Sequence, residues 1–459
     1  MLDAPRATSS DTPTEAGEAW CSDAWRAVGS DLSSHATLLL AVSGGPDSLA
    51  MLVGLAKLRD ARLLASKLSV QTIDHGLRPE SADEAKMVGE VCKELGVPFR
   101  ATKLDRKPFA RNAQDWARGQ RYGALSRTAS ETQSVILTAH TADDQAETLL
   151  MRAARGTGCE GLASIRPQAK LQGAVVVRPF LDWSRAELHA VLDGTPWQPT
   201  QDPSNTDESY TRVRFRTWLA DAPAPDGARG IVDGLAETAH IAGLENTALD
   251  HYALCLFDEV GGAYQGFVDG DLSLCDQPLV VQARFLRLVL GGVARMRSTS
   301  ASDRNMAFGL GRMVALARRI ANEPKGKWVG GGAVLEWWRG KGQDESKTQH
   351  LSAYAESGRA GFPQLAIEPG ESGQWDDRFD VCNWTEKRLT VRAWQSGDPE
   401  PKLDRDGLSK RLLESLPVGE SNGDVVATLQ TGDLGGADKD ACRESGTVFM
   451  AALPRELGQ

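Results

Sequence analysis

The first half of the chain alternates between short apolar runs and longer segments with one apolar side. The short runs predict buried strands, because aliphatic residues follow one another over a length that is too short for a helix. The longer segments predict helices, since their apolar residues recur at helical spacing. The expected strands are 36–42, 67–74, 97–104, 134–140 and 173–180, and the expected helices are 47–60, 81–96, 110–130 and 142–156. This alternation predicts an α/β fold with a doubly wound parallel sheet.

The rest of the chain differs from this half in pattern. Residues 1–30 start polar and are expected to be disordered or variable, and residues 221–230 have the composition of a linker. A helical pattern runs from 231 to about 323, a strand is expected within 331–342, and short strands and turns follow residue 388. We therefore expect an α/β domain at 31–222, a mainly helical middle domain at 230–365 and a small α+β C-terminal domain at 375–459.

Composition limits the classes to which the protein can belong. With 459 residues, of which 41% are hydrophobic and 25% charged, it fits a globular protein of two or three domains. The net charge of −10 excludes an overall basic surface, so a nucleic-acid partner would have to meet local basic patches. The seven cysteines include no CxxC pair, which argues against a disulfide framework or a zinc site. Without a signal-peptide core or an apolar run that could span a bilayer, we expect a cytoplasmic protein with no membrane partner.

The stretch SGGPDS, residues 43–48, lies between an expected strand and an expected helix. Such a turn directs several backbone N–H groups at one point, and the helix dipole adds positive charge there. Gly44 and Gly45 let a ligand approach the backbone closely, while Ser43 and Ser48 add hydroxyl donors. The turn therefore predicts an anion cradle, most naturally for phosphate, although the GxxxxGK(S/T) pattern of other phosphate loops is absent.

Asp47 within this turn leaves two interpretations open. A carboxylate beside phosphate repels it, unless a divalent cation such as Mg²⁺ bridges the two. Alternatively, Asp47 simply favours the start of a helix, and the glycines form a tight turn. The complete string directly after a buried strand favours the first interpretation.

The expected helix after the fourth strand begins with acids. His140, Asp144 and Glu147 are spaced four and three residues apart, so they can share one face that binds Mg²⁺. Alternatively, Thr141 and Asp144 form a capping box, and Asp143 favours the helix start electrostatically. Two arginines near the end of this helix either contact a substrate or complement the helix dipole; they are Arg152 and Arg155.

Two further stretches are rich in polar residues. DHGLRPES, residues 74–81, follows a strand, where His75 and Arg78 would reach phosphate or RNA; a solvated loop is the alternative. QDPSNTDESYTRVRFR, residues 201–216, combines turn formers with a cationic stripe that suits phosphate or adenylate contact. The alternative for this stripe is the solvated start of a basic helix. Its arginines are Arg212, Arg214 and Arg216.

As an ordered set, these stretches resemble the tRNA(Ile)-lysidine synthetases, a family of N-type ATP pyrophosphatases. That family shows an SGGxDS loop, a DHGLRxES stretch, an HxxDDQAET helix, an RPLL-like strand and a DPSNxD loop followed by arginines. This chain has each of them in order between residues 36 and 216, with RPFLDWSRAEL at 178–188 as the fourth. It departs from the family at Val213, where many members have asparagine, and in a C-terminal half that matches only weakly.

The resemblance implies an ATP-dependent ligase that modifies the wobble cytidine of an isoleucine tRNA with anticodon CAU. ATP would adenylate the base, and the side-chain amine of L-lysine would then displace AMP to form lysidine. The implied cofactors are ATP and Mg²⁺, and the implied partners are tRNA(Ile) and L-lysine, with a homodimer as a further expectation. The alternatives are an adenylating enzyme of the same loop class that acts on another tRNA base or a metabolite, and a non-catalytic module that binds ATP or RNA.

The resemblance also implies roles for individual residues. The nucleotide would be held by Ser43, Gly44, Gly45, Pro46, Asp47, Ser48, His75 and Arg78. The catalytic residues would be Asp47, His140, Asp144 and Arg212, with Mg²⁺ shared by Asp47 and Asp144. The substrate-binding residues would be Asp143 and Glu147, one of which pairs with the lysine ammonium, together with Arg152, Arg155 and Arg214. The tRNA would meet basic patches around Arg284, Arg287, Arg295, Arg297, Arg312, Arg318, Arg319, Lys325 and Lys327.

Overall fold

The computed structural model divides the chain into two compact units, residues 1–246 and 247–459. It describes residues 19–74, 81–104, 113–200, 209–222, 230–259, 267–272, 274–294, 308–339, 349–357, 361–376, 378–401, 410–428 and 448–452. Within these ranges, no helix is both long enough and apolar enough to cross a membrane.

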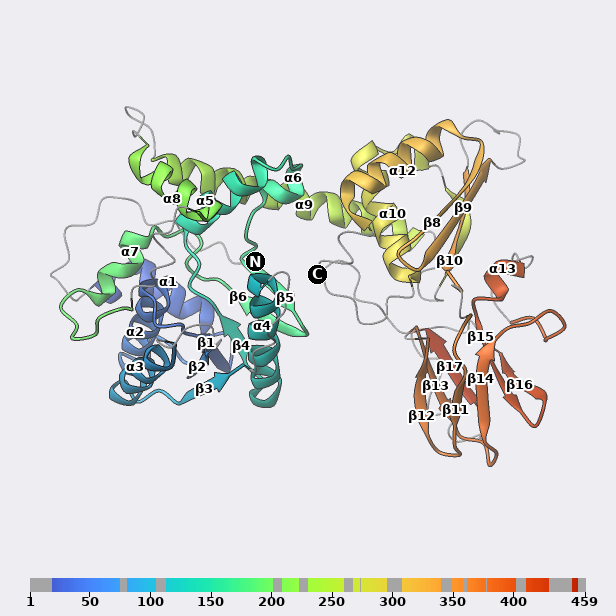
Figure 1. The fold of residues 1–459 in the computed structure, drawn as a ribbon, viewed down its shortest axis with the longest axis horizontal. Helices are drawn as coiled ribbons and strands as arrows, with labels where there is room; N and C mark the ends of the chain where they lie inside the picture. The colour runs from blue at the N-terminus through green and yellow to red at the C-terminus, as the bar shows by residue number, and fades with distance from the viewer. Residues whose placement is uncertain are drawn as a thin grey trace. The chain divides into compact units, whose positions relative to one another are not determined.

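A six-stranded sheet with the order β3-β2-β1-β4-β6-β5 forms the centre of the first unit (Figure 1). Its strands are β1 (Thr37–Ala41), β2 (Lys67–Asp74), β3 (Phe99–Lys103), β4 (Val135–Leu137), β5 (Gln168–Leu171) and β6 (Ala174–Val177). The five expected strands are present and pair in parallel, which confirms the predicted fold class. The strand β5 was not expected, and it pairs antiparallel with β6 at the edge of the sheet.

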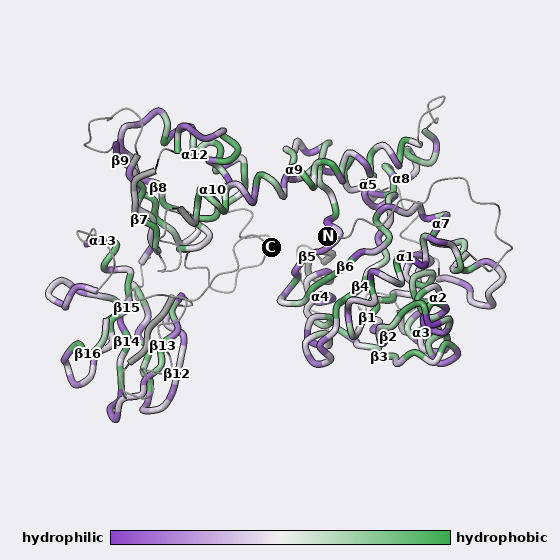
Figure 2. Tube along the Cα trace, turned by 180° about the vertical axis from the view of Figure 1, so that it is seen from behind, coloured by the Kyte–Doolittle hydropathy of each residue, from purple (hydrophilic) through white to green (hydrophobic). Residues whose placement is uncertain are grey.

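Helices cover both faces of this sheet, as a doubly wound fold requires. Alternate residues of β1 point to opposite faces, so Leu38 and Leu40 enter the core with α2 and α3, whereas Leu39 enters the core with α4. The helix α2 is hydrophobic along much of its length (Figure 2), because it is buried on nearly all sides. The helices are α2 (Pro46–Asp60), α3 (Ser81–Glu94), α4 (Ala113–Thr132) and α5 (Ala142–Ala153).

The expectation of disorder over residues 1–30 is wrong for the end of that segment. A short 3-10 helix, η1 (Ala19–Cys21), leads into α1 (Asp23–Leu32), which is capped by Ser22. Trp25, Val28 and Leu32 are buried, at helical spacing, in the core beside α2. The ring of Trp25 lies so close to Gly54 that a Cβ on Gly54 would come within 2.1 Å of it. The expectation of disorder followed from the polar first twenty residues, whereas this apolar face begins after them.

The stretch 178–188 is not the strand that its resemblance implied. The strand β6 ends at Val177, and the following residues form turns that lead into α7 (Arg185–His189). Pro179 lacks an N–H group for a sheet, and Ser184 caps the new helix. The remaining elements of this unit are α6 (Cys159–Leu162), η2 (Ala190–Leu192), α8 (Thr211–Asp221) and α9 (Ile231–Glu259), which runs past its end.

The second unit begins with helices on a four-stranded antiparallel sheet of the order β7-β10-β9-β8. Its elements are β7 (Val268–Leu272), η5 (Leu274–Asp276), α10 (Leu279–Val293), α12 (Leu310–Asn322), β8 (Lys325–Gly330), β9 (Ala333–Arg339) and β10 (Gln349–Ala355). Phe285 and Met313 of the helices lie in one hydrophobic core with Leu335 and Trp337 of β9. A region expected to be mainly helical therefore also contains a sheet, of which only β9 was predicted.

Short strands dominate the end of the second unit. Two antiparallel sheets, β11-β14-β15-β16 and β12-β13-β17, enclose a core around Trp375, Phe379 and Val391. Among the described residues, the helical content after residue 355 is the four-residue α13. The elements are β11 (Leu365–Ile367), β12 (Ser372–Trp375), β13 (Phe379–Asn383), β14 (Leu389–Ala393), α13 (Lys410–Leu413), β15 (Pro417–Ser421), β16 (Asp424–Thr428) and β17 (Val448–Ala452).

Candidate active site

The SGGPDS turn joins β1 to α2. Gly44 has a φ of +90°, a left-handed conformation that favours glycine, and its carbonyl accepts the N–H of Thr200 at 3.0 Å. Gly45 is the N-cap of α2, and Pro46 is its first residue. The first N–H groups of a helix have no acceptors within the helix, so the turn presents donors and the positive end of the helix dipole. This is the geometry that an anion site requires.

The two serines of this turn have different surroundings. Ser48 is buried, and its hydroxyl accepts the N–H of Ser43 at 3.1 Å and donates to the carbonyl of Gly45 at 3.0 Å. Ser43 is exposed, and its hydroxyl lies 3.3 Å from that of Ser48. Ser48 therefore fixes the shape of the turn, whereas Ser43 carries the hydroxyl that a ligand can reach.

Replacing Gly44 by alanine is expected to destabilise the turn. A Cβ on Gly44 would lie 3.2 Å from Oγ1 of Thr200 and 3.3 Å from Cε of Met87, and the residue would keep its positive φ. The expected loss is about 1–2 kcal/mol in the free energy of unfolding, measured in urea. Gly45→Ala is the control, since its φ is −70° and its Cβ would meet Oγ of Ser43 at an ordinary 3.7 Å. An equal loss in the two variants would contradict the role of the left-handed conformation.

Four carboxylates surround the guanidinium of Arg185, the first residue of α7. Its Nη2 lies 2.9 Å from Oδ1 of Asp144 and 3.0 Å from Oε1 of Glu147. Oδ2 of Asp143 accepts the backbone N–H of Arg185 at 2.8 Å, and Oδ1 lies 3.8 Å from its Nη1. Oδ2 of Asp47 lies 3.9 Å from its Nε. These five residues, which we call the Arg185 cluster, connect the acids of α5 to the acid of the SGGPDS turn.

Two arginines of α8 also bind this cluster. Arg212 donates from Nε to Oε2 of Glu147 at 2.6 Å and from Nη2 to Oδ1 of Asp144 at 2.8 Å. Arg216 donates from Nε to Oε1 of Glu147 at 2.8 Å. Residues four apart on a helix share a face, so both arginines meet the acids, whereas Arg214 between them is exposed. Of the three arginines in the cationic stripe, the structure thus brings two to the cluster.

The arginines keep the buried acids ionised. The side chain of Glu147 is only 1% exposed, and burial alone would raise its pKa. Arg216, Arg185 and Arg212 outweigh burial and hold that pKa below its ordinary value. Burial would also raise the pKa of Asp144, but Arg185 and Arg212 outweigh burial and hold that pKa below its ordinary value. At neutral pH the ionised acids therefore fix three guanidinium groups in place before any ligand binds.

Of the acids in the cluster, Asp47 has the carboxylate oxygens that are best placed to bind Mg²⁺. Its side chain is 30% exposed, and its Oδ1 lies 2.6 Å from Nε2 of His189. Both oxygens of Asp144, by contrast, already accept hydrogen bonds, from two arginines and from a backbone N–H. Within the described ranges, no three His, Cys, Asp or Glu side chains are grouped so that they could hold a metal ion. The carboxylate oxygens of Asp47 thus suit a magnesium ion, whereas Asp144 would first have to lose its hydrogen bonds to Arg185 and Arg212.

His140 lies beside the cluster as a neutral imidazole. Its Nδ1 is 2.9 Å from Oγ1 of Thr138. Burial lowers its pKa to about 3, an effect that Asp144 opposes and that nearby arginines reinforce. Any contact of His140 with a ligand at neutral pH would therefore be a hydrogen bond rather than a charge interaction.

His140 is expected to make the stability of the protein depend on pH. The unfolded chain binds a proton at His140 near the ordinary pKa of 6.5, but the folded protein does so only near 3. The free energy of unfolding should therefore fall as the pH drops below about 6.5, by up to about 1.4 kcal/mol for each pH unit. Urea unfolding at pH 7.5 and 5.5 measures this loss, which should be smaller in His140→Gln. Equal losses in both proteins would contradict the lowered pKa.

The other predicted site residues of the first unit lie away from the cluster or outside the described residues. Arg152 donates to the carbonyls of Ser164 at 2.8 Å and Gly161 at 3.3 Å, so it ties α5 to the segment around α6. Arg155 is exposed. His75 and Arg78 lie outside the described residues, as do residues 201–208 of the turn-rich stretch.

The basic residues expected to meet tRNA have unequal access to solvent. Arg284 is buried and pairs with Asp250, so the expectation that it contacts tRNA is wrong. Arg287 also reaches Asp250, whereas Arg319 and Lys327 are exposed but paired with glutamates. The remaining exposed ones are Arg312, Arg318 and Lys325, and those outside the described residues are Arg295 and Arg297.

Arg185 and His189, which lie at the centre of the site, were not predicted from the sequence. A local signal exists, because Ser184 and Glu187 form a capping-box pattern that starts a helix. Residues four apart on such a helix share a face, which brings both side chains toward Asp47. The pattern predicts the helix, but only the tertiary structure shows what it faces.

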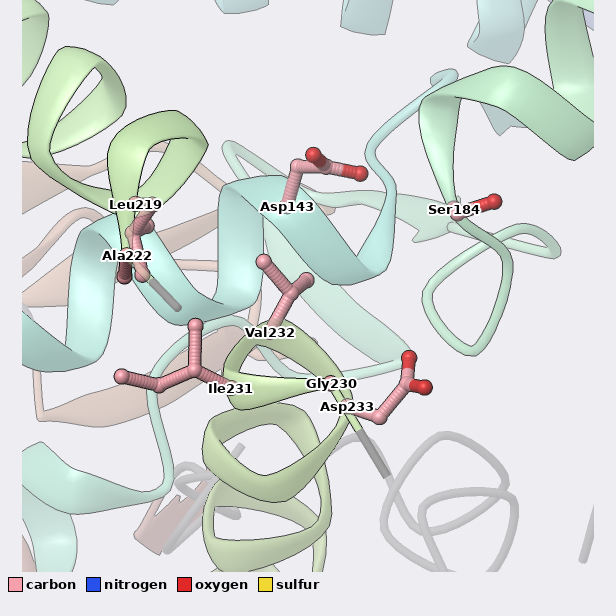
Figure 3. Close-up of a pocket in the computed structure, with 8 residues that line it drawn as sticks. All are labelled: Asp143, Ser184, Leu219, Ala222, Gly230, Ile231, Val232 and Asp233. Carbon is pink, nitrogen blue, oxygen red and sulfur yellow. The ribbon is translucent and has the colours of Figure 1, made fainter. Parts of the chain in front are cut away.

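A cavity of about 230 Å³ adjoins the cluster at Asp143 (Figure 3). It lies among α5, the start of α7, the end of α8 and the start of α9. Asp143 and Asp233 supply carboxylates, while Leu219, Ile231 and Val232 supply aliphatic wall. The cavity therefore offers negative charge and apolar surface together, next to the arginines of the site. The other lining residues are Ser184, Ala222 and Gly230.

Comparison with known proteins identifies relatives of this chain. The family model of the PP-loop domain matches residues 22–222. A tRNA(Ile)-lysidine synthase from Novosphingobium aromaticivorans is 38% identical over 277 residues, which cover 58% of this chain and 80% of that protein. A tRNA(Ile)-lysidine synthase from a Bradyrhizobium species is 42% identical over 192 residues, which cover 42% of this chain and 53% of that protein.

Among solved structures, a U34-tRNA thiolase from Methanococcus maripaludis is similar over 54% of this chain and 89% of its own length. The sequence identity is 15% and the TM-score is 0.41. The family assignment rests instead on the sequence match to the Novosphingobium protein, which extends over four-fifths of that relative. This chain belongs to the tRNA(Ile)-lysidine synthase family.

Proposed function

We propose that this protein joins L-lysine to the wobble cytidine of tRNA(Ile) with anticodon CAU. In the first step, the oxygen on C2 of the base attacks the α-phosphate of ATP, and pyrophosphate leaves. In the second step, the side-chain amine of lysine attacks C2 and gives up a proton. The bond between C2 and the adenylate oxygen breaks, AMP leaves, and lysidine remains.

The observation that carries this proposal is the connection of the Arg185 cluster to the SGGPDS turn through Asp47. The turn offers backbone donors and the hydroxyl of Ser43 to the pyrophosphate portion of ATP. Arg212 is held by two acids and remains 41% exposed, so it can face the phosphate of the adenylate. Since the acids fix the arginines before any ligand arrives, little reorganisation is needed when negative charge develops.

Magnesium, when bound, would offset the negative charge that grows on the phosphates. Asp47 is its proposed ligand, because its carboxylate is partly exposed and lies in the same turn as the phosphate donors. Asp144 would join Asp47 only if its hydrogen bonds to Arg185 and Arg212 were released.

Asp143 is the acid that we propose for the lysine amine. Its side chain is 26% exposed and borders the cavity beside the cluster, where aliphatic side chains suit the methylene groups of lysine. Glu147, the alternative, is only 1% exposed and is engaged by three arginines. Asp143 is therefore preferred, because it is more exposed than Glu147 and is engaged by fewer arginines.

The test uses purified protein, Mg²⁺, ATP and radiolabelled lysine with a transcript of tRNA(Ile) that carries the anticodon CAU. A matched transcript with uridine at the wobble position is the control. Label is expected only in the CAU transcript, with release of pyrophosphate and AMP. Release of pyrophosphate with a different RNA or a metabolite, without label in the CAU transcript, would overturn the proposal and favour another adenylation reaction.

A further inference from the structure

His189 is the closest partner of Asp47 in the described part of the chain. Its Nε2 lies 2.6 Å from Oδ1 of Asp47, and an ionised carboxylate can only accept, so the imidazole donates. The second contact of Asp47 with a side chain is the longer one of 3.9 Å to Arg185. The direction in which the Asp47 carboxylate points is therefore set mainly by His189.

The helix that carries His189 is itself firmly held. Ser184 donates its N–H and its hydroxyl to Oε2 of Glu187 at 2.7 and 2.8 Å, and its Oγ accepts the N–H of Glu187 at 3.2 Å. Leu188 and Val191 are fully buried in the core that also contains α2. A short helix that is capped at its start and anchored by its neighbours can hold an imidazole in one place.

We propose that His189 is a positioning residue, which aims the carboxylate of Asp47 for the binding of Mg²⁺ and ATP. The inference rests on the proposed function, in which Asp47 is the magnesium ligand. Carboxylates that bind metals are usually oriented by a hydrogen bond from a second residue, and loss of that residue typically costs about 10–100-fold in affinity or activity. The geometry of His189 and Asp47 matches this arrangement.

A role in stability alone is a poor explanation of this pair. The two side chains are 32% and 30% exposed, and polar side-chain pairs with such access to water contribute little to folding. His189→Ala is therefore expected to fold, with a thermal midpoint close to that of the wild type. The hydrogen bond can be restored without the imidazole, since the amide of glutamine in His189→Gln can also donate.

The experiment compares wild type, His189→Ala, His189→Gln and, as a matched control, His251→Ala at an exposed histidine of α9. Calorimetric titration with ATP in the presence of Mg²⁺ measures affinity directly, and lysine transfer gives KM for ATP and for lysine. We expect His189→Ala to lose about tenfold or more in ATP affinity, at the lower end of the range for such residues. KM for ATP should rise while KM for lysine stays unchanged. His189→Gln should recover most of the lost ATP affinity.

Two results would overturn the inference. One is an ATP affinity of His189→Ala within twofold of the wild type, and the other is a glutamine variant no better than the alanine variant. The proposed function fails differently, since a wild-type protein that binds ATP with Mg²⁺ but transfers no lysine would disprove only that proposal. The affinity comparison would then still decide the role of His189.

Discussion

Arg185→Ala is expected to lower the free energy of unfolding by about 3–5 kcal/mol and to abolish lysine transfer. Burial alone would lower the pKa of Arg185, but the surrounding carboxylates raise it above its ordinary value, so the side chain is always charged. Its removal leaves Asp144 and Glu147 buried with less compensation, and breaking a buried pair from one side costs more than the pair itself contributes. Urea unfolding measures the loss.

The controls for this prediction separate the cluster from an ordinary ion pair. Arg100 lies 2.9 Å from Glu131 in the same unit, but both side chains are more than half exposed, so Arg100→Ala should cost only about 0–1 kcal/mol. Arg185→Lys keeps the charge but not the planar guanidinium that reaches two acids. Its loss in the free energy of unfolding should lie between those of the two alanine variants. If Arg185→Ala and Arg100→Ala lower the free energy of unfolding equally, the cluster does not contribute to stability as the distances indicate.

The sheet of the first unit could be predicted because each of its central strands is buried on both faces. The strand β1 is a continuous apolar run for this reason, and periodicity identifies it without knowledge of the fold. The strands β7 and β8 contain glycine with aspartate or lysine, residue types that are depleted in strands. Their pairing with β10 and β9 stabilises them, and pairing between distant segments is not visible in a local pattern.

The candidate site could be predicted only in part, for a related reason. The SGGPDS turn and the acids of α5 each form a compact local motif, so the sequence identifies them. The partners of these acids come from α7 and α8, and nothing local in the sequence indicates that Arg185 meets four carboxylates. A capping box explained Asp144 equally well, and the structure shows that it caps the helix and binds arginines at once.

Asp47→Ala is expected to reduce lysine transfer by a factor of roughly 100–1000, the size of effect seen when one group that stabilises transition-state charge is removed. The fold should survive, because the carboxylate is 30% exposed and its side-chain contacts within the described ranges are a hydrogen bond to His189 and a long contact with Arg185. Asp47→Asn keeps the size of the side chain but not its charge, so it should lose nearly as much activity. Lysine transfer at saturating ATP, with circular dichroism as the check on folding, measures the effect.

The role of Asp47 in binding magnesium is tested by the dependence of ATP affinity on Mg²⁺. If Asp47 is a ligand, Mg²⁺ should strengthen ATP binding in the wild type and do so much less in both variants. Asp60→Ala is the matched control, since Asp60 ends the same helix with a side chain that is 63% exposed, and it should behave as the wild type. Near-normal transfer by a folded Asp47→Ala protein would disprove the catalytic role. Unchanged Mg²⁺ dependence with lost transfer would instead assign Asp47 to a step after nucleotide binding.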